Sequence, residues 1–357
     1  MVFLTGASGL LGGALARRLM RGPVRVCALL HEHRPCWAAR RPDALTFVSG
    51  DLTRPRLGLA EGLYRELAGR VTDILHCAAR TEFSLPRPEV ERANVLGTRN
   101  LIAFAHDCRN LRKLGVLSTV YVAGRRTGVI LEGDLAHRAG FVNTYEESKF
   151  RMEQLLRRCG DRLPIAVYRL STVIGSARTG RVEQFNAVHH ALRLFHRGLV
   201  PMVPGSEETP VDLISSDYAA DALFHLFARR FRPGIAYHIV AGEDNSPPLG
   251  QFLESTAELF ARFDPRWRSR GVASPPIVPI ETFRLLEESV EKTGNTVLSQ
   301  IVRVMSAFAP QLAFPKRFDR RNTVAGLRGT GIRPRPLGTY YPRIIRWCLS
   351  ARWGVAG

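Results

Sequence analysis

Three kinds of polar side chain near the middle of the sequence have the spacing that proton transfer requires. Tyr145 and Lys149 are four residues apart, so a helix would place both on one face. Ser118 and Thr119 end an apolar run about 26 residues before Tyr145. A phenol has a pKa of about 10, and a neighbouring ammonium lowers it. The pattern predicts that a hydroxyl, a phenol and an ammonium lie close together, although YxxxK alone occurs by chance in about one such sequence in ten.

A glycine-rich segment near the start of the sequence lies between an apolar run and a helical pattern. Its glycines allow a tight turn, a close approach of backbone to a pyrophosphate, and close packing of helix on strand. The free N–H groups at the helix N-terminus favour an anion. We therefore expect a dinucleotide site, the alternative being a purely structural turn. The residues expected to bind are Gly6, Ser8, Gly9, Leu10, Leu11 and Gly12.

The segment after the second apolar run indicates which dinucleotide binds. His31 stands about 19 residues after Gly12, where a carboxylate would hold the ribose of NAD. Arg34 follows closely, and an arginine there accepts the 2′-phosphate of NADP. The sequence thus favours NADP(H) with His31 and Arg34 as ligands, and NAD(H) is the alternative because of Glu32.

Other residues at strand ends are expected beside the dinucleotide. Asp51 and Leu52 follow the third apolar run, and Asp51 is placed to accept a hydrogen bond from an adenine amino group. Ala78 and Ala79 end the fourth run with small side chains, where the dinucleotide would lie against backbone. Each pair could equally be an ordinary strand terminus. The cluster of His31, His33 and Cys36 lacks a fourth ligand at zinc-site spacing, so no metal is expected.

The elements that must position these side chains alternate between strand and helix over the first 175 residues. Such alternation is typical of βαβ units and a parallel sheet. The expected strands are Val2–Thr5, Val24–Leu30, Leu45–Val48, Thr72–His76, Lys113–Ser118 and Pro164–Leu170. The expected helices are Leu10–Arg21, Glu89–His106 and Tyr145–Cys159. The sequence predicts an α/β fold with a Rossmann-type doubly wound parallel sheet, which binds its ligand beyond the carboxyl ends of the strands.

The strand–helix rhythm ends after Gly175. Helical patterns follow at Glu183–Arg197 and Asp217–Arg229, and Ala236–Val240 is expected to be one more core strand. Helices and proline-rich loops continue from there. We predict an NAD(P)-binding core and a smaller, mainly helical substrate lobe with a basic C-terminal tail. The core is expected to comprise residues 1–175 and 209–242, and the lobe residues 176–208 and 243–357.

The composition fits a soluble enzyme and raises one alternative. The 357 residues include 45% hydrophobic side chains, and no apolar run approaches the roughly 18 residues that cross a bilayer. The six cysteines form no CxxC pair, which favours reduced thiols and a cytoplasmic location. The net charge of +19 invites a nucleic-acid partner, but it comes from 47 Arg and four Lys. We interpret it as a solvated arginine-rich surface, without a nucleic-acid partner.

Several motifs together resemble the extended short-chain dehydrogenases/reductases. They occur in the order of that family, and ST followed by VYVAG, then VIGSARTG, is most similar to its fatty acyl-CoA reductase and thioester (carboxylic acid) reductase branch. The likeness is strong over residues 1–180 and thin beyond 242, and Ser176 departs from the acid frequent in the family. The motifs are Thr5–Gly12, Asp51, Asn94-Val95-Leu96-Gly97-Thr98, Ser118-Thr119, YxxxK and Arg169-Leu170-Ser171-Thr172-Val173-Ile174-Gly175.

The resemblance implies a role for each residue. Thr119, rather than Ser118, would be the catalytic hydroxyl with Tyr145 and Lys149. Lys149 would also hold the nicotinamide ribose, and Ser118, Ser171 and Thr172 would lie near the cofactor. The implied activity is NADPH-dependent reduction of an acyl thioester, on CoA or an acyl carrier protein, to an aldehyde, or to an alcohol if a second hydride follows. The alternatives are a nucleotide-sugar epimerase or dehydratase, a hydroxysteroid dehydrogenase, or a non-catalytic NAD(P)- or nucleic-acid-binding protein.

The end of the sequence carries a basic amphipathic pattern. Tyr341, Ile344, Ile345, Cys348 and Leu349 share one helical stripe, with arginines elsewhere on the helix. Such a helix can lie in a membrane interface, which would suit an oily substrate and a peripheral location. The alternative that we favour is a helix docked on its own lobe.

Overall fold

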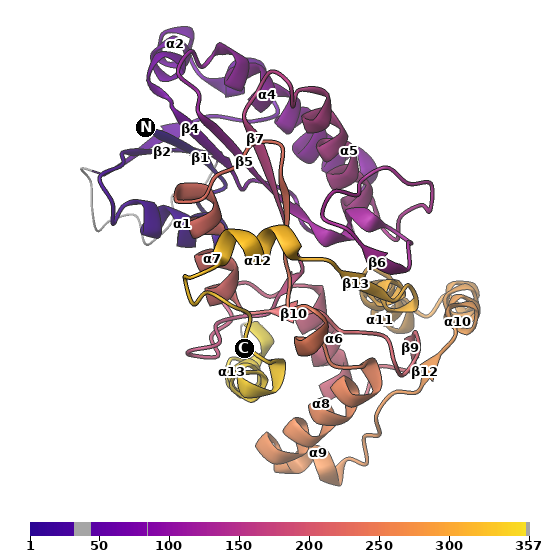
Figure 1. Cartoon of the computed structure of the whole chain (residues 1–357). Coiled ribbons are helices and arrows are strands. Elements are labelled where there is room, and N and C mark those ends of the chain that lie inside the picture. The colour runs from indigo at the N-terminus through magenta and orange to yellow at the C-terminus, as the bar shows by residue number, and fades with distance from the viewer. Residues whose placement is uncertain (32–43, 84, 355–357) are drawn as a thin grey trace.

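The chain is built around a seven-stranded parallel sheet (Figure 1). The computed structural model describes residues 1–31, 44–83 and 85–354. The strand order is β11-β7-β5-β4-β1-β2-β3, so the order reverses between β1 and β4. This arrangement confirms the predicted Rossmann-type sheet, and sheets of this type have their ligand crevice outside the carboxyl ends of the strands at the reversal. The strands are β1 (Val2–Thr5), β2 (Val26–Leu30), β3 (Leu45–Ser49), β4 (Asp73–His76), β5 (Lys113–Thr119), β7 (Ile165–Leu170) and β11 (Ala236–Ile239).

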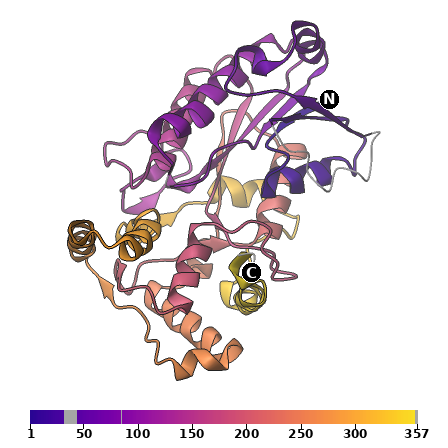
Figure 2. The same ribbon diagram turned by 180° about the vertical axis from the view of Figure 1, so that it is seen from behind.

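Helices cover both faces of the sheet (Figures 1 and 2). On one face α1 (Leu10–Leu19) and α7 (Ser216–Ala228) pack through leucines, alanines and aromatic rings. The opposite face carries α2 (Glu61–Arg70), α4 (Gly97–Asp107) and α5 (Thr144–Arg158). The strands read as continuous apolar runs because both of their faces are buried.

The helical segment after β4 differs from the single helix expected over Glu89–His106. It is divided into α3 (Arg87–Glu91), a π-helical turn at Arg92–Leu96, and α4. A π turn leaves the ordinary helical hydrogen-bond ladder, and such turns are frequent at functional sites. Helical periodicity continues through the turn, which explains why the sequence pattern suggested one helix.

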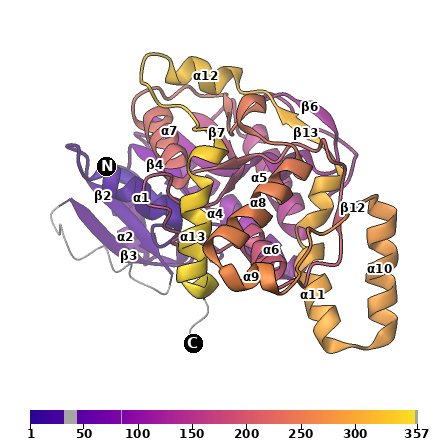
Figure 3. The same ribbon diagram turned by 90° about the horizontal axis from the view of Figure 1, so that it is seen from below.

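A second apolar core lies beyond the carboxyl ends of the strands and is formed by residues from Ile174 onward (Figure 3). Its helices are α6 (Ala187–His196), α8 (Leu249–Phe263), α9 (Pro265–Ser269) and α13 (Tyr341–Ser350). Helix α6 begins later than expected because the Asn186 side chain accepts hydrogen bonds from the N–H groups of Val188 and His189. The exact division into core and lobe stays a prediction.

Helix α13 packs on this second core. Tyr341, Ile344, Ile345 and Cys348 are at most 3% exposed, so the apolar stripe predicted for the tail is covered by the chain itself. The arginines of the helix lie on its other side, with Arg343 and Arg346 exposed. The stripe is therefore not available to a membrane surface in this fold. Within the described ranges, no helix combines the length and apolarity that crossing a bilayer would require.

The last part of the chain returns to the first. Strand β13 (Lys316–Phe318) pairs in parallel with β6 (Gly128–Ile130). Glu132, which follows β6 and is 1% exposed, accepts hydrogen bonds from the Asn322 and Thr323 N–H groups at the start of α12 (Arg321–Leu327). A buried carboxylate needs such donors, so α12 is fixed at the edge of the sheet.

Candidate active site

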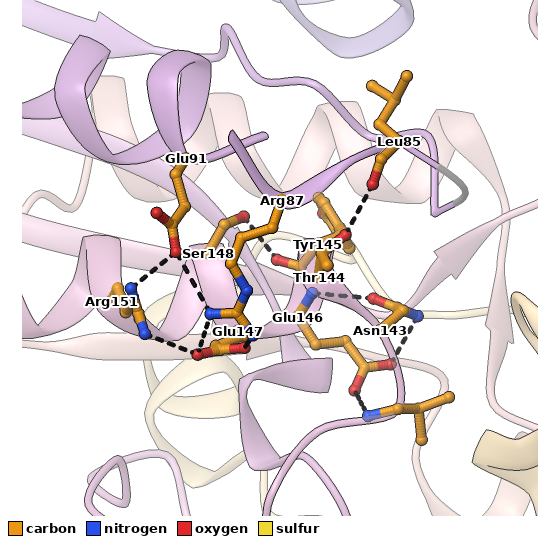
Figure 4. A network of polar contacts seen from close by, with 11 residues as sticks. Leu85, Arg87, Glu91, Asn143, Thr144, Tyr145, Glu146, Glu147, Ser148 and Arg151 are labelled. Atoms are coloured by element: carbon orange, nitrogen blue, oxygen red, sulfur yellow. Dashed lines mark hydrogen bonds and ion pairs between the residues drawn. The ribbon is translucent and has the colours of Figure 1, made fainter. Parts of the chain in front are cut away.

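The first turn of α5 carries the phenol and is fixed from three sides (Figure 4). Asn143 caps the helix, because its side chain accepts a hydrogen bond of 3.0 Å from the Glu146 N–H. Thr144 donates to the Leu85 carbonyl at 3.2 Å. Arg87 makes a bidentate ion pair with Glu147, at 2.9 and 2.6 Å. The segment after β4 and the helix that carries Tyr145 are thus tied together.

Tyr145 and Thr119 are brought together at the carboxyl end of β5. Both side chains are buried, Tyr145 at 9% and Thr119 at 4% exposure. The Thr119 hydroxyl donates to the Leu170 carbonyl at 3.4 Å, and its proximity to the phenol lowers the phenol's pKa. Burial outweighs that effect, and the nearby Glu146 carboxylate adds to it, so the pKa of Tyr145 is raised well above its usual value.

The expectation that Lys149 makes the Tyr145 phenol more acidic stays a prediction, because burial dominates the net shift. The Lys149 ammonium lies one turn further along α5 and donates to the Leu117 carbonyl at 2.7 Å. It also contacts the Met152 sulfur at 3.4 Å. Burial lowers the pKa of Lys149 to about 8, against the opposing charges of Glu153 and Cys77. A phenol that stays protonated at neutral pH can donate a hydrogen bond to a developing oxyanion.

Asn94 is a site residue whose role the sequence did not assign. It lies in the π turn, is 1% exposed, and donates from Nδ2 to the Ser148 hydroxyl at 2.9 Å. Ser148 in turn donates to the Tyr145 carbonyl at 2.7 Å. The motif was visible in the sequence, but only the π turn shows that its amide faces the catalytic helix.

Ser118 lies on the other side of β5 from Thr119, as neighbouring residues of a strand do. Its hydroxyl donates to Glu153 at 2.5 Å. Glu153 also forms a fully buried ion pair with Arg169, at 2.7 Å. Ser118 therefore belongs to a buried polar network under α5, and its predicted contact with the cofactor stays a prediction.

The glycine-rich segment has the geometry of a phosphate cradle. Gly6 has φ of +73°, and a Cβ there would lie 2.5 Å from the Ala78 nitrogen. A Cβ on Gly12 would lie 2.0 Å from the Gly6 carbonyl oxygen. Helix α1 starts at Leu10 with Gly9 as its N-cap, no side chain caps it, and Ser8 is exposed beside it. The N–H groups of Leu10, Leu11 and Gly12 at this end have no partner in the preceding turn of helix. The described residues here fit a dinucleotide pyrophosphate.

The residues expected near the adenosine meet at the ends of β2 and β3. His31 Nε2 lies 3.6 Å from Asp51 Oδ2, and Asp51 accepts two hydrogen bonds of 2.8 Å from Thr53. Burial tends to raise the pKa of Asp51, but the Thr53 hydrogen bonds and the nearby His31 and Arg54 charges lower it overall. Leu52 packs beside Gly97. Arg34, like His33 and Cys36, lies outside the described residues.

The remaining predicted cofactor ligands lie along the crevice. The Ala78 N–H donates to Thr5 Oγ1 at 3.3 Å, and Ala79 follows at the end of β4. Ser171 is buried after β7, and the Thr172 hydroxyl is 2.8 Å from the Tyr121 hydroxyl. The structure thus places these residues at strand ends around the crevice, and their contact with a cofactor stays a prediction.

A small cavity of about 50 Å³ opens beside this crevice. Tyr121, which donates its N–H to Thr119 Oγ1 at 3.2 Å, forms one wall. Phe308 forms part of another and stacks on Phe83, whose ring centroid is 5.3 Å from that of Tyr145. Two of its walls therefore adjoin the catalytic phenol and hydroxyl. We missed this cavity from the sequence because its opposite wall comes from residues 308–318, far along the chain.

Comparison with known families decides what this arrangement belongs to. A model of an NAD-binding family, described as male sterility protein, matches residues 4–223, more than half of the chain. The chain belongs to this family. Membership agrees with the resemblance seen in the sequence and makes this male sterility family member an NAD(P)-dependent oxidoreductase of the extended short-chain type.

Curated relatives of this family member include parts of peptide synthetases. A linear gramicidin synthase of Brevibacillus parabrevis is 25% identical over 66% of this chain and 5% of its own length. The isonitrile lipopeptide synthase of Streptomyces coeruleorubidus is 31% identical over 63% of this chain and 16% of its own. Aldehyde reductase lnbA of Aspergillus flavus is 26% identical over 81% of this chain and 32% of its own length. The chain therefore spans less than a third of each of these relatives.

Solved structures show the same fold over nearly the whole chain. The terminal R domain of the myxalamid PKS-NRPS pathway superposes with a TM-score of 0.79 at 23% identity, covering 99% of this chain and 91% of that one. A UDP-glucuronic acid 4-epimerase from Bacillus cereus, in complex with NAD, gives a TM-score of 0.67 at 15% identity, covering 99% of both chains. At these identities the likeness concerns the fold.

Proposed function

We propose that this family member reduces an acyl thioester, held on a carrier protein or CoA, with NADPH as the hydride donor. The observation that carries the proposal is the buried Thr119–Tyr145 pair beside the phosphate cradle, with a small cavity next to it. The peptide synthetase relatives and the R-domain fold support a carrier-bound thioester. His31, where a carboxylate would suit NAD, supports NADP(H).

The dinucleotide would be held by the cradle of Gly6, Gly9 and Gly12, and when bound it supplies a hydride to the acyl carbon. The protein's own task is to stabilise the charge that develops on the acyl oxygen. Thr119 and Tyr145 would donate hydrogen bonds there, and the protonated phenol would be the acid. Loss of the thiol then gives an aldehyde.

Lys149 supports this site from beneath. The Lys149 side chain is 3% exposed, and its ammonium is held by the Leu117 carbonyl. A ribose hydroxyl that approaches this ammonium would therefore meet a fixed donor. A fixed donor loses little freedom on binding, which favours a single orientation of the cofactor.

The test is NADPH consumption with acyl-CoA and acyl-pantetheine thioesters, with products identified by mass spectrometry. Tyr145→Phe and Thr119→Val should each lose at least about a hundredfold in kcat while binding NADPH normally. Tyr64→Phe removes a phenol that donates to Asp107 far from the site and is the matched control. Unchanged turnover in Tyr145→Phe, or turnover of UDP-sugars instead of thioesters, would refute the proposal.

A further inference from the structure

The cavity beside the catalytic pair is mainly apolar but contains one buried cation. Phe308, Leu312, Phe314 and Phe318 supply apolar surface to it. Lys316, which is 7% exposed, also lines it. A cavity needs at least about 10–15 Å³ of such volume to hold one water, so 50 Å³ accommodates a few atoms of a ligand. Its size and lining suit a short, partly polar acyl group.

The Lys316 ammonium is fixed but not saturated by the protein. It donates to Gln311 Oε1 at 3.0 Å and to the Phe314 carbonyl at 2.9 Å. An ammonium has three N–H donors, so among the described residues one remains without a hydrogen-bond acceptor of the protein. The Phe314 ring centroid is 5.5 Å from the ammonium, within the range of a cation–π contact. A ligand oxygen in the cavity would complete its hydrogen bonding.

Gln311 connects this ammonium to the catalytic helix. Its amide Nε2 donates to the carboxylate of Glu146, the residue next to Tyr145. Glu146 is fully buried and also accepts from the Val142 N–H at 3.0 Å. Burial lowers the pKa of Lys316, and the charge of Glu146 partly offsets this effect. Burial likewise raises the pKa of Glu146, and the charge of Lys316 partly offsets that effect. The chain of contacts fixes Lys316 relative to the phenol.

We propose that Lys316 is a specificity residue that binds a neutral carbonyl oxygen of the acyl group, a few bonds from the thioester. This rests on the proposed function. Plain alkyl chains would leave the third N–H of a buried ammonium unpaired, which is unfavourable. A carboxylate would meet Asp212, another residue of the cavity wall. An amide or ketone carbonyl satisfies the ammonium without adding a charge.

The test compares S-acyl pantetheines of matched length, without NADPH so that they stay intact. Pentanoyl and 4-oxopentanoyl differ only by the carbonyl oxygen, N-acetylglycyl offers an amide, and succinyl offers a carboxylate. By titration calorimetry, the 4-oxopentanoyl and N-acetylglycyl thioesters should bind wild type at least about tenfold more tightly than pentanoyl. Equal binding of the pentanoyl and 4-oxopentanoyl thioesters would overturn the proposal. Tightest binding of the succinyl thioester, or no binding of any of the four thioesters, would also overturn it.

Variants then assign the preference to one side chain. Lys316→Met should reduce the preference for the carbonyl to less than about twofold, and Lys316→Arg should restore part of it. Lys292→Met, the same change at an exposed position of α10 (Ile280–Thr293), should keep all of it. A preference that persists in Lys316→Met would overturn the assignment. The wild-type comparison stands even if that variant fails to fold.

The same ligands separate this inference from the function on which it rests. Carbonyl-selective binding without NADPH consumption would refute thioester reduction and retain the cavity assignment. NADPH consumption with equal turnover and binding of pentanoyl and 4-oxopentanoyl would retain thioester reduction and refute the role of Lys316.

Discussion

Replacing Gly12 by alanine tests the phosphate cradle most directly. The added Cβ would lie 2.0 Å from the Gly6 carbonyl oxygen, 1.4 Å inside the 3.4 Å at which ordinary contact begins. Both groups are held by backbone, since Gly12 is in the first turn of α1 and Gly6 directly follows β1. Relief therefore requires that the helix move away from the sheet.

The size of the effect follows from this overlap. Inserting a methyl group into a packed site costs about 1–3 kcal/mol, so the free energy of unfolding should fall by that amount. A displacement of about 1 Å at a positioned site can cost a hundredfold, so NADPH affinity should fall at least tenfold. Gly9→Ala adds a Cβ at an ordinary 3.4 Å with φ of −77°. It should change the free energy of unfolding by less than about 1 kcal/mol.

The assays are urea unfolding without cofactor and NADPH fluorescence titration. Gly69→Ala, in helix α2 with nothing within 4 Å of its Cβ, is the control. It should leave affinity unchanged and stability equal or up to about 1 kcal/mol higher. A Gly12→Ala variant with the stability and NADPH affinity of wild type would refute the cradle.

Three further outcomes are expected. Glu153→Gln breaks a buried ion pair with Arg169 and should lower the free energy of unfolding by about 3–5 kcal/mol. Glu61→Gln breaks an exposed ion pair with Arg65 and should lower it by less than about 1 kcal/mol. Equal losses in the two variants would contradict this prediction. Burial holds the Lys149 pKa at about 8 against 10.5, so the unfolded chain binds more protons between these values and stability rises with pH. The stability of wild type relative to Lys149→Met should therefore grow by about 3 kcal/mol from pH 7.5 to pH 10.5, and a flat or falling difference is the contrary result. Ile344→Ala in α13 removes a fully buried side chain and should cost about 2–5 kcal/mol by urea unfolding, while a loss under 1 kcal/mol would show that the helix is not docked.

Local patterns in the sequence were sufficient for the sheet and the catalytic helix. Strand β1 was predicted with its exact bounds, and α5 differs from the expected helix by one residue at each end. Both are fixed by neighbours in the sequence: the apolar run of a buried strand, and an Asn143 cap before a helical pattern. The glycine cradle was predictable for the same reason, since the overlap that forbids a side chain at Gly12 arises within the segment.

Interactions between distant residues could not be predicted. The cavity depends on Lys316 and Gln311, which lie more than 160 residues after Tyr145 and approach it through tertiary contacts such as that of Gln311 with Glu146. The raised pKa of Tyr145 could not be predicted either, because it is set by burial in the folded chain. The spacing of residue types shows that a phenol and an ammonium are near each other. It does not show how far packing buries them, and burial shifts their pKa values.

The hydrogen bonds of Glu132 also constrain how the chain folds during translation. The carboxylate is buried against N–H groups of residues about 190 positions later, and β6 pairs with a strand equally far along. A ribosome that adds about 5–20 residues per second needs roughly 10–40 seconds to cover that interval. During that time the loop after β6 carries a solvated carboxylate that cannot yet find its donors. The contact between Glu132 and α12 at the edge of the sheet is thus completed only after residue 323 has emerged.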